Sequence, residues 1–169
     1  MRRVLLAAAL VAAPLAVRAQ TPWDVAKKTA GQSATGKLKK EVNKRLLEEG
    51  RKNQCSFKSG TAELEKGCDA KARRLAKALI DAKKKLTGAG VQNFKFLVSG
   101  HTDSTGDPEK NKALSADRAA VMVKQLVEKG VPAAEIESLG MGSERPLVKP
   151  DDTPAKRAKN RRYEVQVKL

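Results

Sequence analysis

From residue 54 onward, segments with the hydrophobic pattern of a strand alternate with segments that carry apolar residues at helical spacing. This pattern predicts alternating strands and helices. Two segments carry apolar residues at helical spacing, residues 68–86 and 115–129. Four short segments have the pattern of strands, residues 54–58, 94–99, 136–139 and 163–169, and a helical turn is expected within 152–159. This order predicts an α+β fold, a two-layer βαβαββ sandwich whose helices pack on one face of a mixed four-stranded sheet.

The ends of the second predicted helix have capping signals. Ser115 can serve as its N-cap, and Gly130 followed by Pro132 ends it in the expected way. Arg118 then falls in the first turn of this helix. In the first predicted helix, the apolar stripe consists of Ala72, Leu75, Ala76, Leu79 and Ile80.

Residues 20–53 form a basic segment that we expect to be partly helical or flexible. Any helix that begins earlier should be interrupted at Gly31, Ser33, Thr35 and Gly36. The few apolar residues of this segment can offset only a small part of the entropy lost when it becomes ordered. A short amphipathic helix is expected at 37–49, where one face carries Leu38, Val42, Leu46 and Leu47. The predicted domain itself runs over residues 54–169.

The first 19 residues have the organisation of a secretory signal peptide. Arg2 and Arg3 precede a 14-residue apolar stretch, and small residues flank a plausible cleavage site at Ala19. The stretch is short for a membrane-spanning helix, which needs about 20 residues. We therefore expect an exported, periplasmic protein with no transmembrane segment in the mature chain.

The formal net charge of +16 predicts an attraction to polyanions. An exported protein seldom meets nucleic acid, so nucleic acid is not expected as a partner. Peptidoglycan, with its stem-peptide carboxylates, and anionic lipid head groups are the polyanions of the cell envelope. The charge therefore indicates peptidoglycan or anionic lipid as the partner and does not decide between them.

Cys55 and Cys68 are the two cysteines of the chain, and an even count in an exported protein favours a disulfide between them. Two unpaired buried thiols are the alternative. Two thiolates and the distant His101 cannot complete a four-ligand zinc site, so no metal or other cofactor is expected.

Asp103 and Arg118 form an opposed pair of charges at a strand end and a helix start. A ligand end that carries both an ammonium and a carboxylate needs such a pair, with the guanidinium gripping the carboxylate through two hydrogen bonds. The plain alternative is a structural ion pair that holds loop to helix.

Five separated blocks of sequence surround these two residues in a fixed order. They are Gly100–Asp103, Asn111 with Leu114–Ala119, Gly130, Gly140–Pro146 and Asn160–Glu164. In these blocks the chain resembles the OmpA-like C-terminal domain family, the peptidoglycan-binding module of OmpA, Pal and MotB. The resemblance covers roughly residues 53–169.

The resemblance implies a site for the meso-diaminopimelate of the peptidoglycan stem peptide. In the family, the aspartate matching Asp103 holds the ammonium, and the arginine matching Arg118 holds the carboxylate. Thr102 and Asn111 match positions beside the ligand. Asn160 and Arg161 are expected to support the loops of the site.

Function is therefore expected to be binding rather than catalysis. The main hypothesis is a non-catalytic module that anchors an exported envelope protein to the cell wall. No acyl anchor is expected, because no cysteine directly follows the cleavage site at Ala19. Outer-membrane or other envelope proteins are further expected partners. The alternative is an envelope interaction protein that uses its basic surface on anionic lipid, a polyanion or a partner protein. A cell-wall enzyme ranks third, because His101 has no evident nucleophile or metal and is interpreted as a packing residue.

Overall fold

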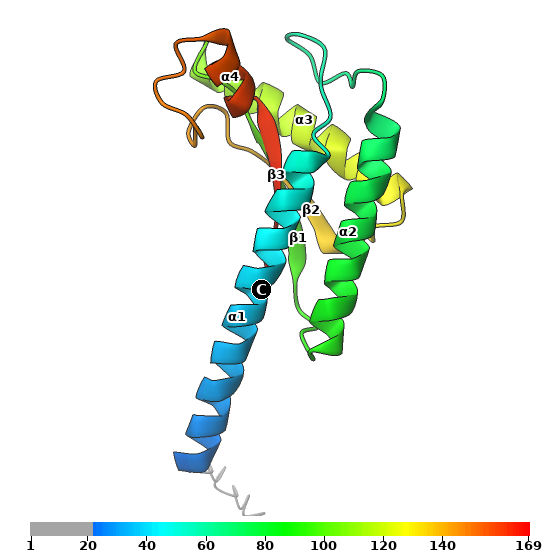
Figure 1. Ribbon diagram of the computed structural model, residues 1–169, viewed down its shortest axis with the longest axis vertical. Coiled ribbons are helices and arrows are strands. Elements are labelled where there is room, and N and C mark those ends of the chain that lie inside the picture. Colours follow the sequence, from blue (N-terminus) through cyan, green and yellow to red (C-terminus); the bar gives the residue numbers. More distant parts are fainter. Residues whose placement is uncertain (1–21) are drawn as a thin grey trace, which may run out of the picture. The chain divides into compact units, whose positions relative to one another are not determined.

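The computed structural model describes residues 22–169 (Figure 1). The predicted signal peptide at residues 1–19 lies outside the described residues. The chain divides into two compact units after Ser33, and the second unit, Ala34–Leu169, holds the sheet and the helices that cover it.

The secondary structure follows the predicted alternation of helices and strands. The described elements in chain order are α1 (Pro22–Lys52), α2 (Cys68–Gly88), β1 (Lys95–His101), α3 (Pro108–Glu128), the 3-10 turn η1 (Ala133–Glu135), β2 (Ile136–Gly140), α4 (Pro154–Asn160) and β3 (Arg162–Lys168).

The sheet is mixed, with the strand order β2-β1-β3. β1 runs parallel to β2 and antiparallel to β3. The α+β class, the mixed sheet and the layer of helices on one face are confirmed. The prediction of four strands was wrong, because three strands form the sheet of the described residues.

Residues 54–58 do not form the predicted first strand. Their only ladder contact is an isolated bridge between Phe57 and Leu64. The outer side of β3, where a fourth strand could pair, is instead met by side-chain amides. Gln54 bonds the backbone N–H and C=O of Tyr163, and Asn43 bonds those of Val167. Amide side chains therefore replace a strand ladder beside β3.

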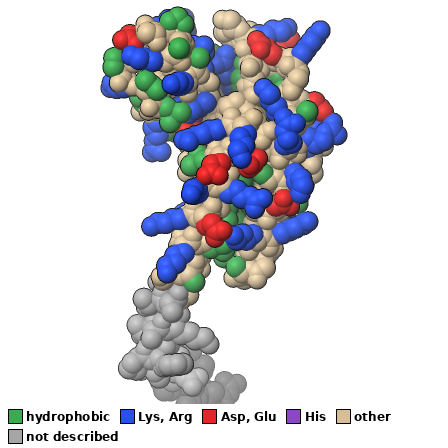
Figure 2. Space-filling view, in the orientation of Figure 1, with side chains coloured by type: hydrophobic (Ala, Val, Ile, Leu, Met, Phe, Trp, Pro, Cys, Tyr) green, Lys and Arg blue, Asp and Glu red, His purple; other side chains and the backbone are tan. Residues whose placement is uncertain are grey.

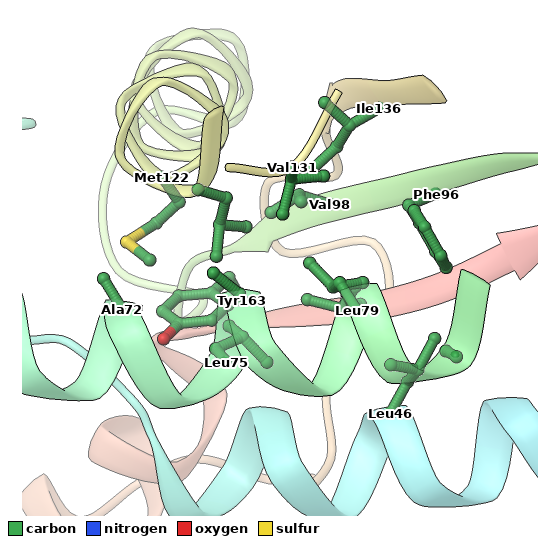
Figure 3. Close-up of a cluster of buried hydrophobic side chains, with 14 of the residues drawn as sticks. Leu46, Ala72, Leu75, Leu79, Phe96, Val98, Met122, Val131, Ile136 and Tyr163 are labelled. Carbon is green, nitrogen blue, oxygen red and sulfur yellow. The ribbon is translucent and has the colours of Figure 1, made fainter. Parts of the chain in front are cut away.

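The hydrophobic core lies between the helices and one face of the sheet (Figure 3). Along β3, Tyr163, Val165 and Val167 are buried while the residues between them are partly exposed, which confirms the predicted alternation. Leu75 and Leu79 of α2 face the same core, as its apolar stripe predicted.

Helix α1 continues without interruption through Gly31 and Gly36, where the sequence predicted a break. Val42 and Leu46 are buried in the core and fix its later turns. Extending a formed helix costs less than nucleating one, so glycine penalties of about 1 kcal/mol each do not end it. Within the described residues, no helix is long and apolar enough to cross a membrane.

Helix α3 begins seven residues before the predicted N-cap. Asp107 is the N-cap, and its carboxylate accepts a hydrogen bond from the backbone N–H of Lys110 at 2.9 Å. Pro108 follows as the first helical residue, where its missing N–H costs nothing. The prediction of Ser115 as N-cap was therefore wrong, and Arg118 lies in the helix interior rather than in its first turn.

Two glycines let α3 approach the sheet closely. A Cβ atom at Gly100 of β1 would collide with the backbone carbonyl of Ser115. A Cβ atom at Gly140 of β2 would lie 2.6 Å from the carbonyl oxygen of Lys112. Both contacts are with helix backbone, which cannot move aside as a flexible side chain could.

We predict that Gly100→Ala lowers the free energy of unfolding by about 2 kcal/mol or more, because α3 must shift to admit the methyl group. Gly50→Ala is the matched control. Its Cβ meets nothing within 4 Å, and alanine favours the helix, so stability should stay constant or rise. Urea denaturation of both variants measures this, and an unchanged midpoint for Gly100→Ala would contradict the close packing.

Candidate functional site

A groove of about 1120 Å³ opens at the carboxyl end of the central strand β1. Its walls come from the end of α1, the loop after it, α3, and the junction of α4 with β3. The groove brings together the sequence-predicted residues Thr102, Asp103, Asn111, Arg118 and Arg161. Asn160 is buried behind this wall.

Asp103 lies two residues after β1, and its side chain is 11% exposed. One carboxylate oxygen accepts a hydrogen bond from Arg161 at 2.7 Å, and the other accepts one from the backbone N–H of Thr105 at 3.1 Å. Burial raises the pKa of Asp103, but these bonds to Arg161 and Thr105 outweigh it, so the pKa lies below its ordinary value. The carboxylate is therefore charged at neutral pH.

Arg118 projects from the interior of α3 and is held by the loop after α1. Its Nε donates to the backbone carbonyl of Thr61 at 2.8 Å, and its guanidinium lies 5.1 Å from the ring centre of Phe57. Burial and the nearby Arg161 lower its pKa, and Asp103 raises it. The described residues contain no ion pair between Arg118 and a carboxylate. The alternative of a structural Asp103–Arg118 ion pair is thus wrong.

Thr102 and Asn111 flank these charges. Thr102 is 4% exposed, and its hydroxyl has no hydrogen-bond partner among the described residues. The side-chain amide of Asn111 donates to the carbonyl of Thr105 at 2.8 Å and so joins α3 to the loop that carries Asp103. A buried hydroxyl without a partner is uncommon in folded proteins.

Asn160 connects the loops behind the groove. Its amide oxygen accepts from the backbone N–H groups of Leu147 and Val148, and its amide nitrogen donates to Asp151 at 3.0 Å. Asp151 also accepts from the backbone and hydroxyl of Ser104, and these bonds lower its pKa to about 2. These contacts agree with the expectation that Asn160 supports the loops of the site, whereas the link through Asp151 to Ser104 was not predicted.

Arg161 does more than was expected of a supporting residue, because it bonds Asp103 directly. Asp103 and Arg161 are separated by 58 residues, and no local pattern joins them. The prediction had paired Asp103 with Arg118 across the ligand. In the structure, Arg161 holds the carboxylate that the ligand ammonium was expected to meet.

The predicted disulfide between Cys55 and Cys68 is confirmed, with 5.0 Å between the two Cα atoms. It ties the loop after α1 to the first residue of α2. This loop supplies Phe57 and the carbonyl of Thr61, the groups that hold Arg118. The disulfide therefore supports one wall of the groove.

His101 is buried at the end of β1, with one ring nitrogen 3.3 Å from the hydroxyl of Ser99 and the other without a described partner. Burial lowers its pKa to about 4, and the charges of Arg162 and Arg145 act in the same direction, while Glu164 acts against them. The ring is therefore neutral near pH 7. These surroundings agree with the interpretation of His101 as a packing residue.

The fold and the groove define a two-layer α+β domain with a polar site at the carboxyl ends of its parallel strands. The OmpA family matches residues 56–161, which is more than half of the chain. The chain belongs to the OmpA family.

Curated relatives match over part of the chain. The peptidoglycan-binding protein ArfA of Mycobacterium tuberculosis is 43% identical over 73 residues, which are 43% of this chain and 22% of ArfA. The peptidoglycan-associated lipoprotein of Agrobacterium fabrum is 40% identical over 60 residues, 36% of this chain and 34% of the lipoprotein. The matches thus cover about a third or less of these relatives.

Solved structures with the same fold include two bacterial proteins. The C-terminal domain of Helicobacter pylori MotB has a TM-score of 0.56 and 26% identity, covering 69% of this chain and 84% of that chain. The peptidoglycan-associated lipoprotein from Burkholderia pseudomallei has a TM-score of 0.53 and 26% identity, covering 67% and 86%.

We predict that replacing Cys55 and Cys68 together by serine lowers the free energy of unfolding by about 3 kcal/mol, because the unfolded chain regains the freedom of the closed loop. Urea denaturation with and without a reducing agent measures the effect. The reducing agent should destabilise the unmodified protein and leave the double variant unchanged. Equal midpoints for the unmodified protein in both conditions would contradict the prediction.

We predict that His101 makes stability fall as the pH drops from about 6.5 to about 4, because the unfolded chain binds a proton there and the folded chain does not. The loss can reach about 3 kcal/mol for a pKa lowered to about 4. His101→Phe keeps a ring of similar size and removes the proton site. Urea midpoints at pH 7 and 4.5 should therefore differ less for the variant, and equal differences would refute this.

Proposed function

We propose that this protein binds peptidoglycan through the diaminopimelate of the stem peptide and makes or breaks no bond in it. Asp103 would receive the ammonium and Arg118 the carboxylate of that residue, with Thr102 and Asn111 beside them. The names of the curated relatives, a peptidoglycan-binding protein and a peptidoglycan-associated lipoprotein, support the ligand class. The family match includes all four of these residues, which line the groove, and this supports the site.

The observation that carries the proposal is the state of Arg118. Its guanidinium faces the groove, is partly desolvated, and bonds only backbone carbonyls among the described residues. A buried or half-buried guanidinium without an acidic partner favours an incoming carboxylate, which it can bind through two hydrogen bonds.

Asp103 supplies the complementary charge 15 positions earlier in the chain. Its two oxygens accept one bond each from Arg161 and Thr105, and a carboxylate has about four lone-pair sites. An ammonium can therefore join the Asp103–Arg161 pair without displacing either donor. This arrangement favours a zwitterionic ligand end over a plain anion.

The alternative of a basic surface that attracts polyanions has less support. Figure 2 shows acidic side chains among the Lys and Arg side chains on the face that it draws. On α2, four basic residues form ion pairs: Arg73 with Asp69, Lys77 with Asp81, Lys83 with Glu135 and Lys85 with Glu41. Paired charges present a weaker field to a distant polyanion.

We further propose that the protein works in the periplasm and links an envelope component to the cell wall. Peptidoglycan lies in that compartment, and the disulfide is of the kind that persists in oxidising surroundings. The basic amino-terminal segment is the part of the chain we assign to the second attachment, to the outer membrane or an envelope protein.

We predict that Asp103→Ala and Arg118→Ala each weaken binding to purified peptidoglycan sacculi by about 2 to 5 kcal/mol, because each leaves one ligand charge without its partner. Co-sedimentation with sacculi over a range of protein concentrations measures the affinity. Asp117→Ala and Lys124→Ala are matched controls, since both residues are exposed on α3 and neither lines the groove.

Wild-type binding by either variant would contradict the proposed roles. A salt series separates the alternative surface from the groove. Sacculus binding that disappears at high salt and is equally strong in both groove variants would favour attraction by the basic surface.

A further inference from the structure

We propose that the groove contains a second anion-binding subsite, formed by Arg51 of α1 with Arg157 and Lys159 of α4. It would take a second carboxylate of the same stem peptide, the α-carboxylate of the glutamyl residue next to diaminopimelate. This inference rests on the proposed function. It makes α1 part of the binding site, although Arg51 lies outside the residues 56–161 that match the family.

The first line of support is the balance of charge in the groove. Two of its acidic residues are already paired, Asp103 with Arg161 and Glu164 with Arg162 at 2.8 Å. Among the described residues, Glu65 is the one groove carboxylate outside an ion pair. Four cations that line the groove lack a carboxylate partner among the described residues: Arg51, Arg118, Arg157 and Lys159. The groove therefore contains unpaired positive charge in addition to that of Arg118.

The second line of support is the position of Arg157. Arg161 is the C-cap residue of α4, and its backbone N–H donates to the carbonyl of Arg157 at 3.0 Å, so Arg157 lies one turn before the residue that holds Asp103. The guanidinium of Arg157 donates to the backbone carbonyls of Asp151 and Asp152 at 3.4 and 3.2 Å. These bonds orient the guanidinium without neutralising it.

The third line of support is the way α1 is attached to this region. Gln54, three residues after Arg51, donates to the carbonyl of Tyr163 at 2.7 Å. Tyr163 follows Arg161 by two residues, so the end of α1 is fixed beside the junction of α4 and β3. Arg51 is exposed on that end, lines the groove, and has no bonding partner among the described residues.

These placements identify the ligand chemistry. A peptide whose zwitterionic end lies at Asp103 and Arg118 meets Arg161 first, because Arg161 bonds Asp103. Continuing along the groove, it meets the cations at the α1 and α4 end. A guanidinium pair favours a carboxylate over an amide, so the subsite should distinguish a free glutamyl carboxylate from its amidated form.

Isothermal titration calorimetry with the full chain tests the subsite through three probes. They are L-alanyl-γ-D-glutamyl-meso-diaminopimelate, the same tripeptide amidated at the glutamyl α-carboxylate, and free meso-diaminopimelate. We expect Arg51→Gln to weaken binding of the acidic tripeptide about fivefold, the effect of losing one partly exposed charge contact. Affinity for the amidated tripeptide and for free diaminopimelate should stay constant.

Two control variants sharpen the test. Lys44→Gln removes one positive charge from an exposed position of the same helix that does not line the groove, and should bind all three probes normally. Arg51→Lys keeps the charge and should retain most of the preference for the acidic tripeptide.

Two results would overturn the subsite: unchanged affinity of Arg51→Gln for the acidic tripeptide, or equal weakening for the acidic and amidated forms. The proposed function fails by a different result, wild-type affinity of Asp103→Ala for free diaminopimelate. The two failures are therefore distinguishable in one set of titrations.

Discussion

The close approach of α3 to the sheet is the constraint on which the site depends. Gly100 and Gly140 leave no side chain between the strands and the helix backbone. Ser115 then reaches across, and its hydroxyl accepts from the N–H of Gly142 at 2.8 Å, while the carbonyl of Gly142 accepts from Thr102 at 2.9 Å. The end of β1, the turn after β2 and the middle of α3 are thus locked together, and the relative positions of Asp103 and Arg118 follow from that lock.

Local patterns in the sequence were sufficient for most of the fold and for part of the site. The alternation in β3 and the apolar stripe of α2 each depend on neighbours in the chain, and both were predicted correctly. The start of α3 was misplaced although its signal, Asp107 before Pro108, was present in the sequence. The missing strand and the Asp103–Arg161 pair could not be predicted in this way. They depend on contacts across 109 and 58 residues, which no periodicity encodes.

The net charge alone does not show where this protein can bind an anion, because acidic residues near each basic side chain reduce its effect. A formal charge of +16 suggests a uniformly basic surface, yet much of the charge on α2 is balanced by acidic side chains nearby. In the groove the balance is different, because backbone carbonyls rather than carboxylates hold the guanidiniums of Arg118 and Arg157. Carbonyls orient a cation and leave its charge available, so the distribution of acidic partners, rather than the number of basic residues, decides where an anion can bind.

The side-chain amides of Asn43 and Gln54 affect whether two copies of the protein can associate through β3. A strand at the border of a sheet presents unpaired backbone groups that another chain can use to extend the sheet. On β3, those two side chains already occupy the backbone groups of Val167 and Tyr163, from α1 and from the residues just after it. Copies that come close together are therefore hindered from extending the sheet through the border at β3.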